Sequence, residues 1–165
     1  MSLHADLSRL FGRELAALRD ELHAYPDERM IWALPPGLPN SAGTLTLHLV
    51  GNLRWFIGAQ LGSSGYERNR PLEFSARDVP RATLIAGIES AADEVTRALA
   101  SLEDSDLERP YPPEIASIPV STALFLQHVA SHLAYHLGQV DYHRRIVTGS
   151  SLSVGALALS SIADR

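Results

Sequence analysis

Four stretches of this chain carry apolar residues at every third or fourth position, and that spacing limits the fold more than any other feature. It places apolar side chains on one face of an α-helix and polar side chains on the other. The stretches cover residues 3–24, 41–61, 78–102 and 121–148. We find no useful run of strand-like alternation and no internal repeat, so the sequence predicts an all-α fold built as a four-helix bundle.

Helix-breaking and capping residues mark the ends of the first two predicted helices. Proline disfavours helix at the residue before it, so the first helix should stop near Tyr25–Pro26. Asn40–Ser41 offers an N-cap for the second helix, which should reach about Leu61. Gly51 and Gly58 inside that helix predict some departure from regular geometry, because glycine is a poor helix former.

The third and fourth helices have their own boundary signals. Asp78, followed by Pro80, should start the third helix. Ser121 or its neighbour should open the fourth, which should run to residue 147 or 148 and end at Gly149, a natural C-terminal capping residue.

The connecting segments are rich in proline, glycine and polar residues, which is typical of irregular structure. Residues 27–40 should form a loop with a short turn at Met30–Leu34, residues 62–78 a polar loop, and residues 103–119 an extended crossover. Linkers of about 16 residues are longer than an up-down-up-down bundle needs, so we expect at least one crossover connection. The tail, residues 150–165, should pack on the bundle as a short helix or remain partly loose.

Length and composition limit the possible function. A chain of 165 residues suits one domain and is too short for two, so we expect a single domain over residues 1–165. A net charge of −5 argues against nucleic-acid binding, and no apolar run is long enough to span a membrane. The N-terminus lacks the apolar centre of a signal peptide, which favours the cytoplasm. The absence of cysteine excludes disulfides, thiolate ligands and a cysteine nucleophile.

The fourth stretch contains the most informative string, His132-x-x-x-His136-x-Gly138-Gln139. Residues four apart lie on the same face of a helix, about 6 Å apart along its axis, so His132 and His136 can bind one metal ion together. Both lie on one flank of the apolar face, His136 roughly 40° from its centre and His132 roughly 80°.

The other histidines allow several interpretations. His48 flanks the apolar face of the second stretch and is the natural candidate for a third metal ligand. His143 and His128 lie roughly 60° and 120° from the apolar centre of the fourth stretch, so each either supports the site or is simply exposed. Any one of these histidines could instead be a hydrogen-bonded boundary residue. His4 and His23 are predicted to lie on the surface of the first helix.

Taken together, these motifs resemble those of the DinB/YfiT-like superfamily. The resemblance covers nearly the whole chain and rests on residues in the second and fourth helices: Asn40, Ser41, Leu45, His48, His132, His136, Gly138 and Gln139, with Arg144 or Arg145 following. It implies a four-helix bundle, often arranged up-down-down-up and frequently a homodimer. It also implies a divalent metal, nickel or zinc, held by His48, His132 and His136. Relatives include thiol S-transferases that use bacillithiol and maleylpyruvate isomerases that use mycothiol.

The leading hypothesis is therefore a metal-dependent enzyme, such as a thiol S-transferase, whose metal lowers the pKa of a bound thiol or water. A low-molecular-weight thiol is the cosubstrate that the resemblance implies. One alternative is a non-catalytic, stress-related dimeric bundle with a structural or vestigial metal site. Another is a metal-dependent hydrolase, which needs a general base; Asp141 points roughly 140° away from His136 and cannot serve.

Some further residues are candidates for binding a substrate or a second copy of the chain. Arg54, Arg68 and Arg70 could bind an anionic group near the metal, although arginines in polar loops are usually solvated. Tyr135 and Tyr142 could donate a hydrogen bond or simply pack at the helix boundary. The tail Leu152–Ile162 is apolar for a terminus, so we expect it to contribute to a homodimer.

Overall fold

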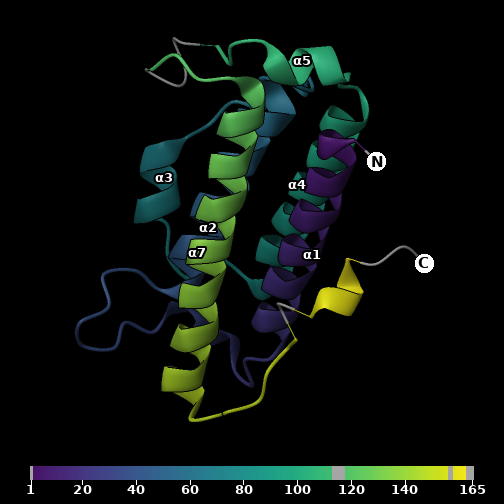
Figure 1. Cartoon of the computed structure of the whole chain (residues 1–165). Helices are drawn as coiled ribbons and strands as arrows, with labels where there is room; N and C mark the ends of the chain where they lie inside the picture. The colour runs from purple at the N-terminus through teal and green to yellow at the C-terminus, as the bar shows by residue number, and fades with distance from the viewer. Residues whose placement is uncertain (1, 113–117, 156–157, 163–165) are drawn as a thin grey trace.

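The computed structural model of the protein describes residues 2–112, 118–155 and 158–162. Within these ranges the ordered elements are helical, apart from one isolated bridge between Pro110 and Ser121. Four long helices run side by side and form the bundle: α1 (Leu3–His23), α2 (Ala42–Leu53), α4 (Arg81–Ala100) and α7 (Thr122–Thr148) (Figure 1). The predicted all-α bundle is confirmed.

The apolar spacing seen in the sequence becomes the core of this bundle. Each long helix buries one face, as the predicted stripes require. In α1 the buried apolar face consists of Leu7, Phe11, Leu15, Leu18 and Leu22. In α7 it consists of Leu126, Val129, Leu133, Leu137 and Val140.

The predicted caps of α2 and α7 are present. The Ser41 hydroxyl accepts a hydrogen bond from the backbone N–H of Thr44, and the Ser121 hydroxyl accepts one from Leu124. Gly149 ends α7 at φ 68°, a left-handed conformation that glycine adopts without steric cost. These caps satisfy backbone groups that have no partner inside the helix.

The helices follow an up-down-down-up order, which the contacts between their ends establish. The Arg81 side chain donates to the backbone oxygen of Tyr25, so α4 begins where α1 ends and runs antiparallel to it. The Phe56 and Phe125 rings lie 5.3 Å apart, so α7 begins beside the end of the second helical segment. Val50 of α2 lies beside Gly87 of α4, and Arg54 just after α2 pairs with Glu94 further along α4, so α2 and α4 run parallel to each other. The helix α7 runs antiparallel to α2 (Figure 1).

A parallel pair of neighbours needs a connection that travels back along the bundle. That connection contains α3 (Arg70–Ser75), a short helix packed beside α2, where the sequence predicted only a polar loop. The Asn69 side chain caps α3 by accepting from the backbone N–H of Leu72. The crossover therefore carries ordered side chains to the middle of the bundle.

Other boundaries differ from the prediction for local reasons. The third long helix begins at Arg81 with Pro80 as its N-cap, because Asp78 adopts a positive φ of 56° that is incompatible with helix. In the predicted extended crossover, residues 103–108 instead form a capping box and the short helix α5 (Asp104–Glu108). Residues 113–117 of that crossover lie outside the described residues.

Short helical segments complete the fold: η1 (Glu28–Trp32), η2 (Arg54–Ala59) and η3 (Leu159–Ser161). The η2 segment continues α2 as a π-helix, the irregularity that the internal glycines predicted. In the tail, Leu152 and Leu159 are exposed, and residues 156–157 lie outside the described part of the chain. Because the structure contains a single chain, the predicted homodimer stays a prediction. No helix among the described residues is long and apolar enough to cross a membrane.

Candidate metal centre

Antiparallel packing brings three histidines together from two helices. His48 comes from α2, and His132 and His136 come from successive turns of α7. One ligand atom from each lies within 4.8 Å of the other two. The Nε2 atoms of His48 and His132 are 3.2 Å apart. Two nitrogens bound tetrahedrally to one ion at about 2.0–2.1 Å lie about 3.3–3.4 Å apart, so this spacing suits a shared metal ion.

A carboxylate fixes the orientation of the His48 ring. The Nδ1 atom of His48 lies 3.0 Å from Oε2 of Glu73, a buried residue of α3. An ionised carboxylate can only accept, so Nδ1 carries the proton and the Nε2 lone pair points into the cluster. Metal-binding histidines commonly donate their second ring N–H to such a partner. The sequence analysis missed Glu73, because it expected a loop there.

Arg68 holds Glu73 in its ionised form. Its Nε and Nη2 atoms donate to the two carboxylate oxygens at 2.7 and 2.8 Å. Arg68 Nη2 also lies 3.3 Å from His48 Nδ1, which is longer than the 3.0 Å between Nδ1 and Glu73 Oε2. We therefore conclude that the proton on His48 Nδ1 is donated to Glu73. Burial acts to raise the pKa of Glu73, but the hydrogen bonds from Arg68 and His48 outweigh it and lower that pKa overall.

Gly51 gives Glu73 the space that this contact needs. A Cβ atom at position 51 would lie 2.1 Å from Oε1 of Glu73, far inside van der Waals contact. The glycine lies within α2, where it costs helix stability. The close approach of the Glu73 carboxylate to the α2 backbone explains why glycine stands at this position despite that cost.

The two histidines of α7 are held neutral, as metal binding requires. Burial, reinforced by the neighbouring imidazoles, lowers the pKa of His132 to about 4. Burial and His48 also lower the pKa of His136, although a hydrogen bond to Gln139 acts in the opposite direction. His136 Nδ1 lies 2.7 Å from Gln139 Oε1, and donation there leaves Nε2 as the ligand atom. The donor set therefore fits a divalent ion such as zinc or nickel.

The remaining histidines lie outside the group of three. His143 is buried, donates from Nε2 to the Ala33 oxygen at 2.8 Å, and accepts at Nδ1 from the Tyr25 hydroxyl at 2.7 Å. It ties α7 to the chain that follows α1, and it lines a cavity that His136 also lines. His128 is exposed, with its ring 6.5 Å from that of His132, and it lines the same cavity as His48 and His132. His23 is exposed and His4 is partly buried against Ser2.

The three candidate arginines have different partners. Arg54 donates to Glu94 of α4 at 2.6 and 3.0 Å, and Arg68 is paired with Glu73. Arg70 has no carboxylate partner among the described residues, and its guanidinium lies over the Phe74 ring at 5.1 Å. Of the three, Arg70 is the one whose charge is available to a ligand.

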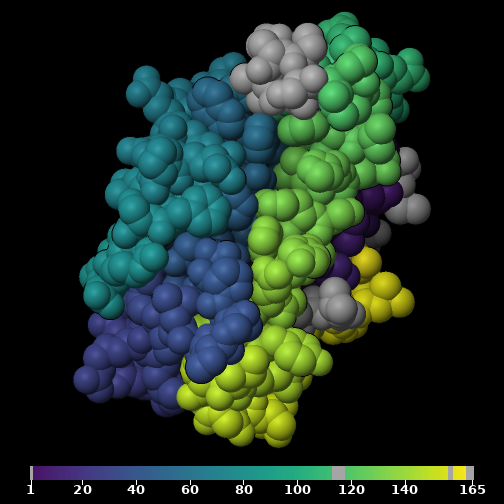
Figure 2. Space-filling view, turned by 90° about the vertical axis from the view of Figure 1, so that its left-hand side faces the viewer, coloured from purple at the N-terminus to yellow at the C-terminus, as the bar shows by residue number. Residues whose placement is uncertain are grey.

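Two cavities each take part of their lining from the histidine cluster. Figure 2 shows the face on which α7 (green) borders the blue and teal segments that contain α2 and the crossover. A polar cavity of about 350 Å³ lies between α7 and the crossover, and its lining includes His48, Asn52, Phe56, Arg70, Phe125 and His132. An apolar cavity of about 290 Å³ lies further along α7, and its lining includes Leu38, Leu45, Tyr135, His136, Tyr142 and Ile146. The cluster therefore faces two separate spaces of small-molecule size.

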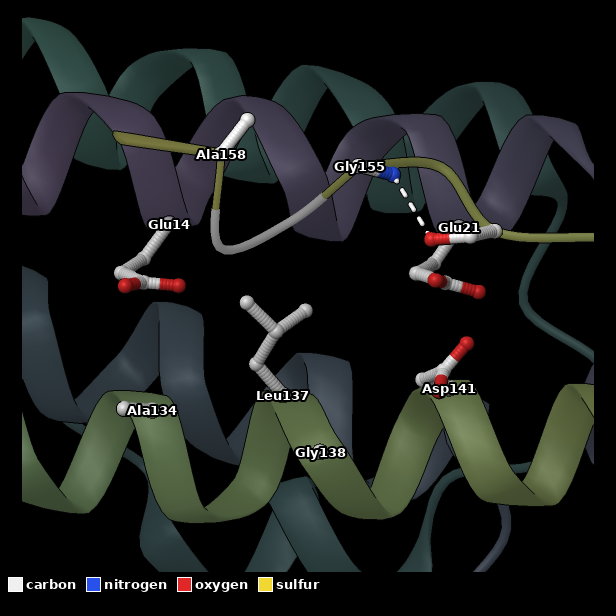
Figure 3. Close-up of a pocket in the computed structure, with 9 residues that line it drawn as sticks. Glu14, Glu21, Ala134, Leu137, Gly138, Asp141, Gly155 and Ala158 are labelled. Atoms are coloured by element: carbon white, nitrogen blue, oxygen red, sulfur yellow. Dashed lines mark hydrogen bonds between the residues drawn. The ribbon is translucent and has the colours of Figure 1, made fainter. Parts of the chain in front are cut away.

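A third cavity, of about 440 Å³, lies on another side of α7 and contains no histidine (Figure 3). Glu14 and Glu21 of α1 point toward Leu137 and Asp141 of α7 across this space. Arg144 is buried beside it and pairs with Glu21 and Asp141. This arginine, which fitted the sequence resemblance, thus lies away from the histidine cluster.

Comparison with known families gives one match. A family model described as the DinB superfamily matches residues 10–140, more than half of the chain. The matched segment includes all three clustered histidines, Glu73 and Arg70. No curated protein matches the chain.

Proposed function

The chain belongs to the DinB superfamily, and from that membership and its histidine cluster we propose that it is a metal-dependent transferase acting on a low-molecular-weight thiol. The observation that carries the proposal is that two cavities are each lined by part of one three-histidine cluster. Three protein ligands leave at least one position open, as catalytic metal sites do. A zinc or nickel ion held there would lower the pKa of a bound thiol.

The two cavities favour transfer between two molecules. His48 and His132 line the polar cavity, whereas His136 lines the apolar cavity. A thiol in one cavity and an acceptor in the other would both reach the cluster, and this proximity alone accelerates a reaction. The exposed Tyr135 and Tyr142 side chains at the apolar cavity offer hydroxyl donors and aromatic surface to an acceptor.

Hydrolysis is less well supported by the side chains at this site. A hydrolase needs a general base within hydrogen-bond reach of the attacking water. Glu73 is the carboxylate that contacts the cluster, and both of its oxygens are already occupied by Arg68 and His48. A strong ion pair with arginine also makes this carboxylate a weak base.

The test begins with protein expressed without a histidine tag. We expect about one zinc or nickel ion per chain and metal-dependent transfer of cysteine to monochlorobimane, followed by bimane fluorescence. His136→Ala should lose both, while losing only about 1–2 kcal/mol of folding stability through the small void. If His136→Ala kept full metal occupancy, the metal would lie elsewhere. If metal-loaded wild type accelerated no transfer, the protein would be a non-catalytic metal-binding bundle.

A further inference from the structure

The three clustered histidines differ at Nδ1, the ring nitrogen that faces away from the cluster. Nδ1 of His48 lies against Glu73, and Nδ1 of His136 lies against Gln139. Nδ1 of His132, in contrast, is buried without a hydrogen-bond partner among the described residues. Metal-binding histidines commonly donate this second ring N–H to an oxygen acceptor, which fixes the ring and strengthens metal binding. His132 is therefore the histidine of the cluster whose acceptor still has to be identified.

A second unsatisfied atom lies on the facing helix. Oδ1 of Asn52 in α2 is also buried without a hydrogen-bond partner in the described part of the chain. We propose that Asn52 is the positioning residue of His132, and that its Oδ1 atom accepts a hydrogen bond from His132 Nδ1 when the cluster holds a divalent metal. This inference rests on the metal binding of the proposed function but not on its thiol chemistry.

The register of α2 against α7 brings these two side chains to one level of the bundle. The Nε2 atoms of His48 and His132 are 3.2 Å apart. About two turns further along α2, the Phe56 ring lies 5.3 Å from that of Phe125. Asn52 is midway between these two contacts and lines the same cavity as His132. Side chains lean toward the N-terminus of their own helix, so on antiparallel helices Asn52 and His132 lean toward each other.

The tautomer of His132 explains why the two atoms are not paired as they stand. His48 donates its Nδ1 proton to Glu73, so its Nε2 atom can only accept. The contact of 3.2 Å between the two Nε2 atoms then places the proton of His132 on Nε2, which leaves its Nδ1 as an acceptor. Oδ1 of Asn52 is an acceptor as well, and two acceptors do not form a hydrogen bond.

Coordination through Nε2 requires the other tautomer of His132. A nitrogen that binds a metal uses its lone pair, so the ring proton must then be on Nδ1. The Nε2 proton leaves to solvent and another is taken up at Nδ1, so the ring keeps one proton and stays neutral. Nδ1 is now a buried donor, for which Asn52 supplies a buried acceptor. Because this hydrogen bond forms only in the metal-bound protein, it favours metal binding.

The zinc affinity of the full chain, measured by chelator competition, tests the role of Asn52. Asn52→Leu should weaken zinc binding roughly 10-fold, as the loss of such a partner does. Its thermal unfolding without zinc should not change, because an apolar group replaces an unsatisfied polar one. Asn52→Asp should not weaken zinc binding, since it keeps an acceptor oxygen. Gln60→Leu is the matched control, because this amide ends the same helical run but lines a different cavity.

NMR of the imidazole rings gives a readout that a purely structural role would not change. Zinc added to isotope-labelled protein should move the His132 proton from Nε2 to Nδ1, which the nitrogen chemical shifts of the ring report. In zinc-loaded wild type this N–H should be protected from exchange with water, whereas in zinc-loaded Asn52→Leu it should exchange rapidly. The ring N–H of His143, which donates to the Ala33 oxygen, should stay protected in both proteins.

The outcomes separate this inference from the function on which it rests. If wild type bound no zinc, the metal-dependent function itself would fail. If wild type bound zinc but Asn52→Leu kept a protected His132 N–H, another group would be the acceptor and the role of Asn52 would be wrong. Weaker zinc binding by Asn52→Asp would also contradict an acceptor role. Should Asn52→Leu not fold, an unprotected His132 N–H in zinc-loaded wild type would by itself overturn the proposal.

Discussion

Two polar clusters lie against different faces of α7, and they differ in where their partners come from. On one face, Arg144 is fully buried and binds Glu21 of α1, Asp141 one turn away and the backbone oxygen of Leu152. On the other face, the Nε2 atoms of His48 and His132 point at each other. The first cluster pairs its arginine with carboxylates of the chain, although Oε1 of Glu21 has no hydrogen-bond partner among the described residues. The second cluster presents lone pairs that an external cation would satisfy.

This difference distinguishes a structural cluster from a ligand-binding one. The Arg144 cluster connects α1, α7 and the tail, as a buried ion pair with several hydrogen bonds can do. Burial raises the pKa of Glu21 against the opposing contact with Arg144, so the cluster depends on that arginine. In the histidine cluster Glu73 orients His48 and Gln139 orients His136, and the inner Nε2 atoms remain available. The Nδ1 atom of His132 is buried without a hydrogen-bond partner among the described residues.

The largest expected effect tests the structural side of this comparison. Arg144→Met should lower the free energy of unfolding by about 3–5 kcal/mol, because Glu21 is left buried without its cation. Metal content of the folded fraction should not change. Urea unfolding and metal analysis measure the two quantities. The double variant Glu21→Leu/Arg144→Met should be closer to wild type, since no uncompensated charge remains there. Equal stability of the single variant and wild type would show that the pair is not structural.

A second variant tests the histidine side. Glu73→Gln should weaken zinc binding by about 10–100-fold, because the partner that orients His48 loses its charge. Competition with a chelator measures this affinity. Glu94→Gln is the matched control, since it breaks the ion pair of another buried glutamate, with Arg54, that does not contact a histidine. If both variants bound zinc like wild type, the contact between Glu73 and His48 would have no role in metal binding.

Acidification should affect metal-free protein through the histidine cluster. The pKa of His132 is about 4 in the folded chain against an ordinary value of 6.5. Between these values the unfolded chain binds a proton that the folded chain does not, so stability falls as the pH is lowered from about 6.5 to about 4. His136 acts in the same direction. Urea midpoints across this range should slope less in His132→Asn, and saturating zinc should move the loss to lower pH.

The sequence was sufficient to predict the histidines but not the carboxylate that positions them. His132 and His136 are four residues apart on one strongly periodic helix, and His48 flanks the apolar face of another, so local geometry alone brings them near the core. Glu73 lies in a six-residue helix within a polar segment, and its contact with His48 spans 25 residues of chain. Such a contact depends on the path of the crossover, which periodicity does not determine.

Some sequence signals for this crossover helix were nevertheless present. Asn69 followed by Pro71 is a typical helix start, with a capping side chain and a proline in the first turn. Gly51, in the middle of a helix, indicated a close approach by another part of the chain. The search for a carboxylate near the histidines considered Asp141 on the same helix. It did not consider the connection between α2 and α4, from which the partner comes.

The smallest expected effect comes from a pair of glycines that separates helix propensity from the site. Both Gly12 and Gly51 lie inside helices, where alanine is favoured by up to about 1 kcal/mol. A Cβ at position 12 meets nothing within 4 Å, so Gly12→Ala should raise the free energy of unfolding by about 0.5–1 kcal/mol and leave zinc affinity unchanged.

At position 51 the same methyl group would lie 2.1 Å from Oε1 of Glu73, so the carboxylate must move away from α2. Gly51→Ala should therefore gain little or no folding stability. It should weaken zinc binding roughly 10-fold, which is the smallest effect expected for Glu73→Gln. Thermal unfolding and chelator competition on both variants measure the contrast. Because the two substitutions are chemically identical, a loss of zinc affinity confined to position 51 can only come from what the added methyl displaces. If Gly51→Ala instead behaved like Gly12→Ala in both measurements, the Glu73 side chain would not need the space beside α2, and the orientation of His48 would have to depend on another group.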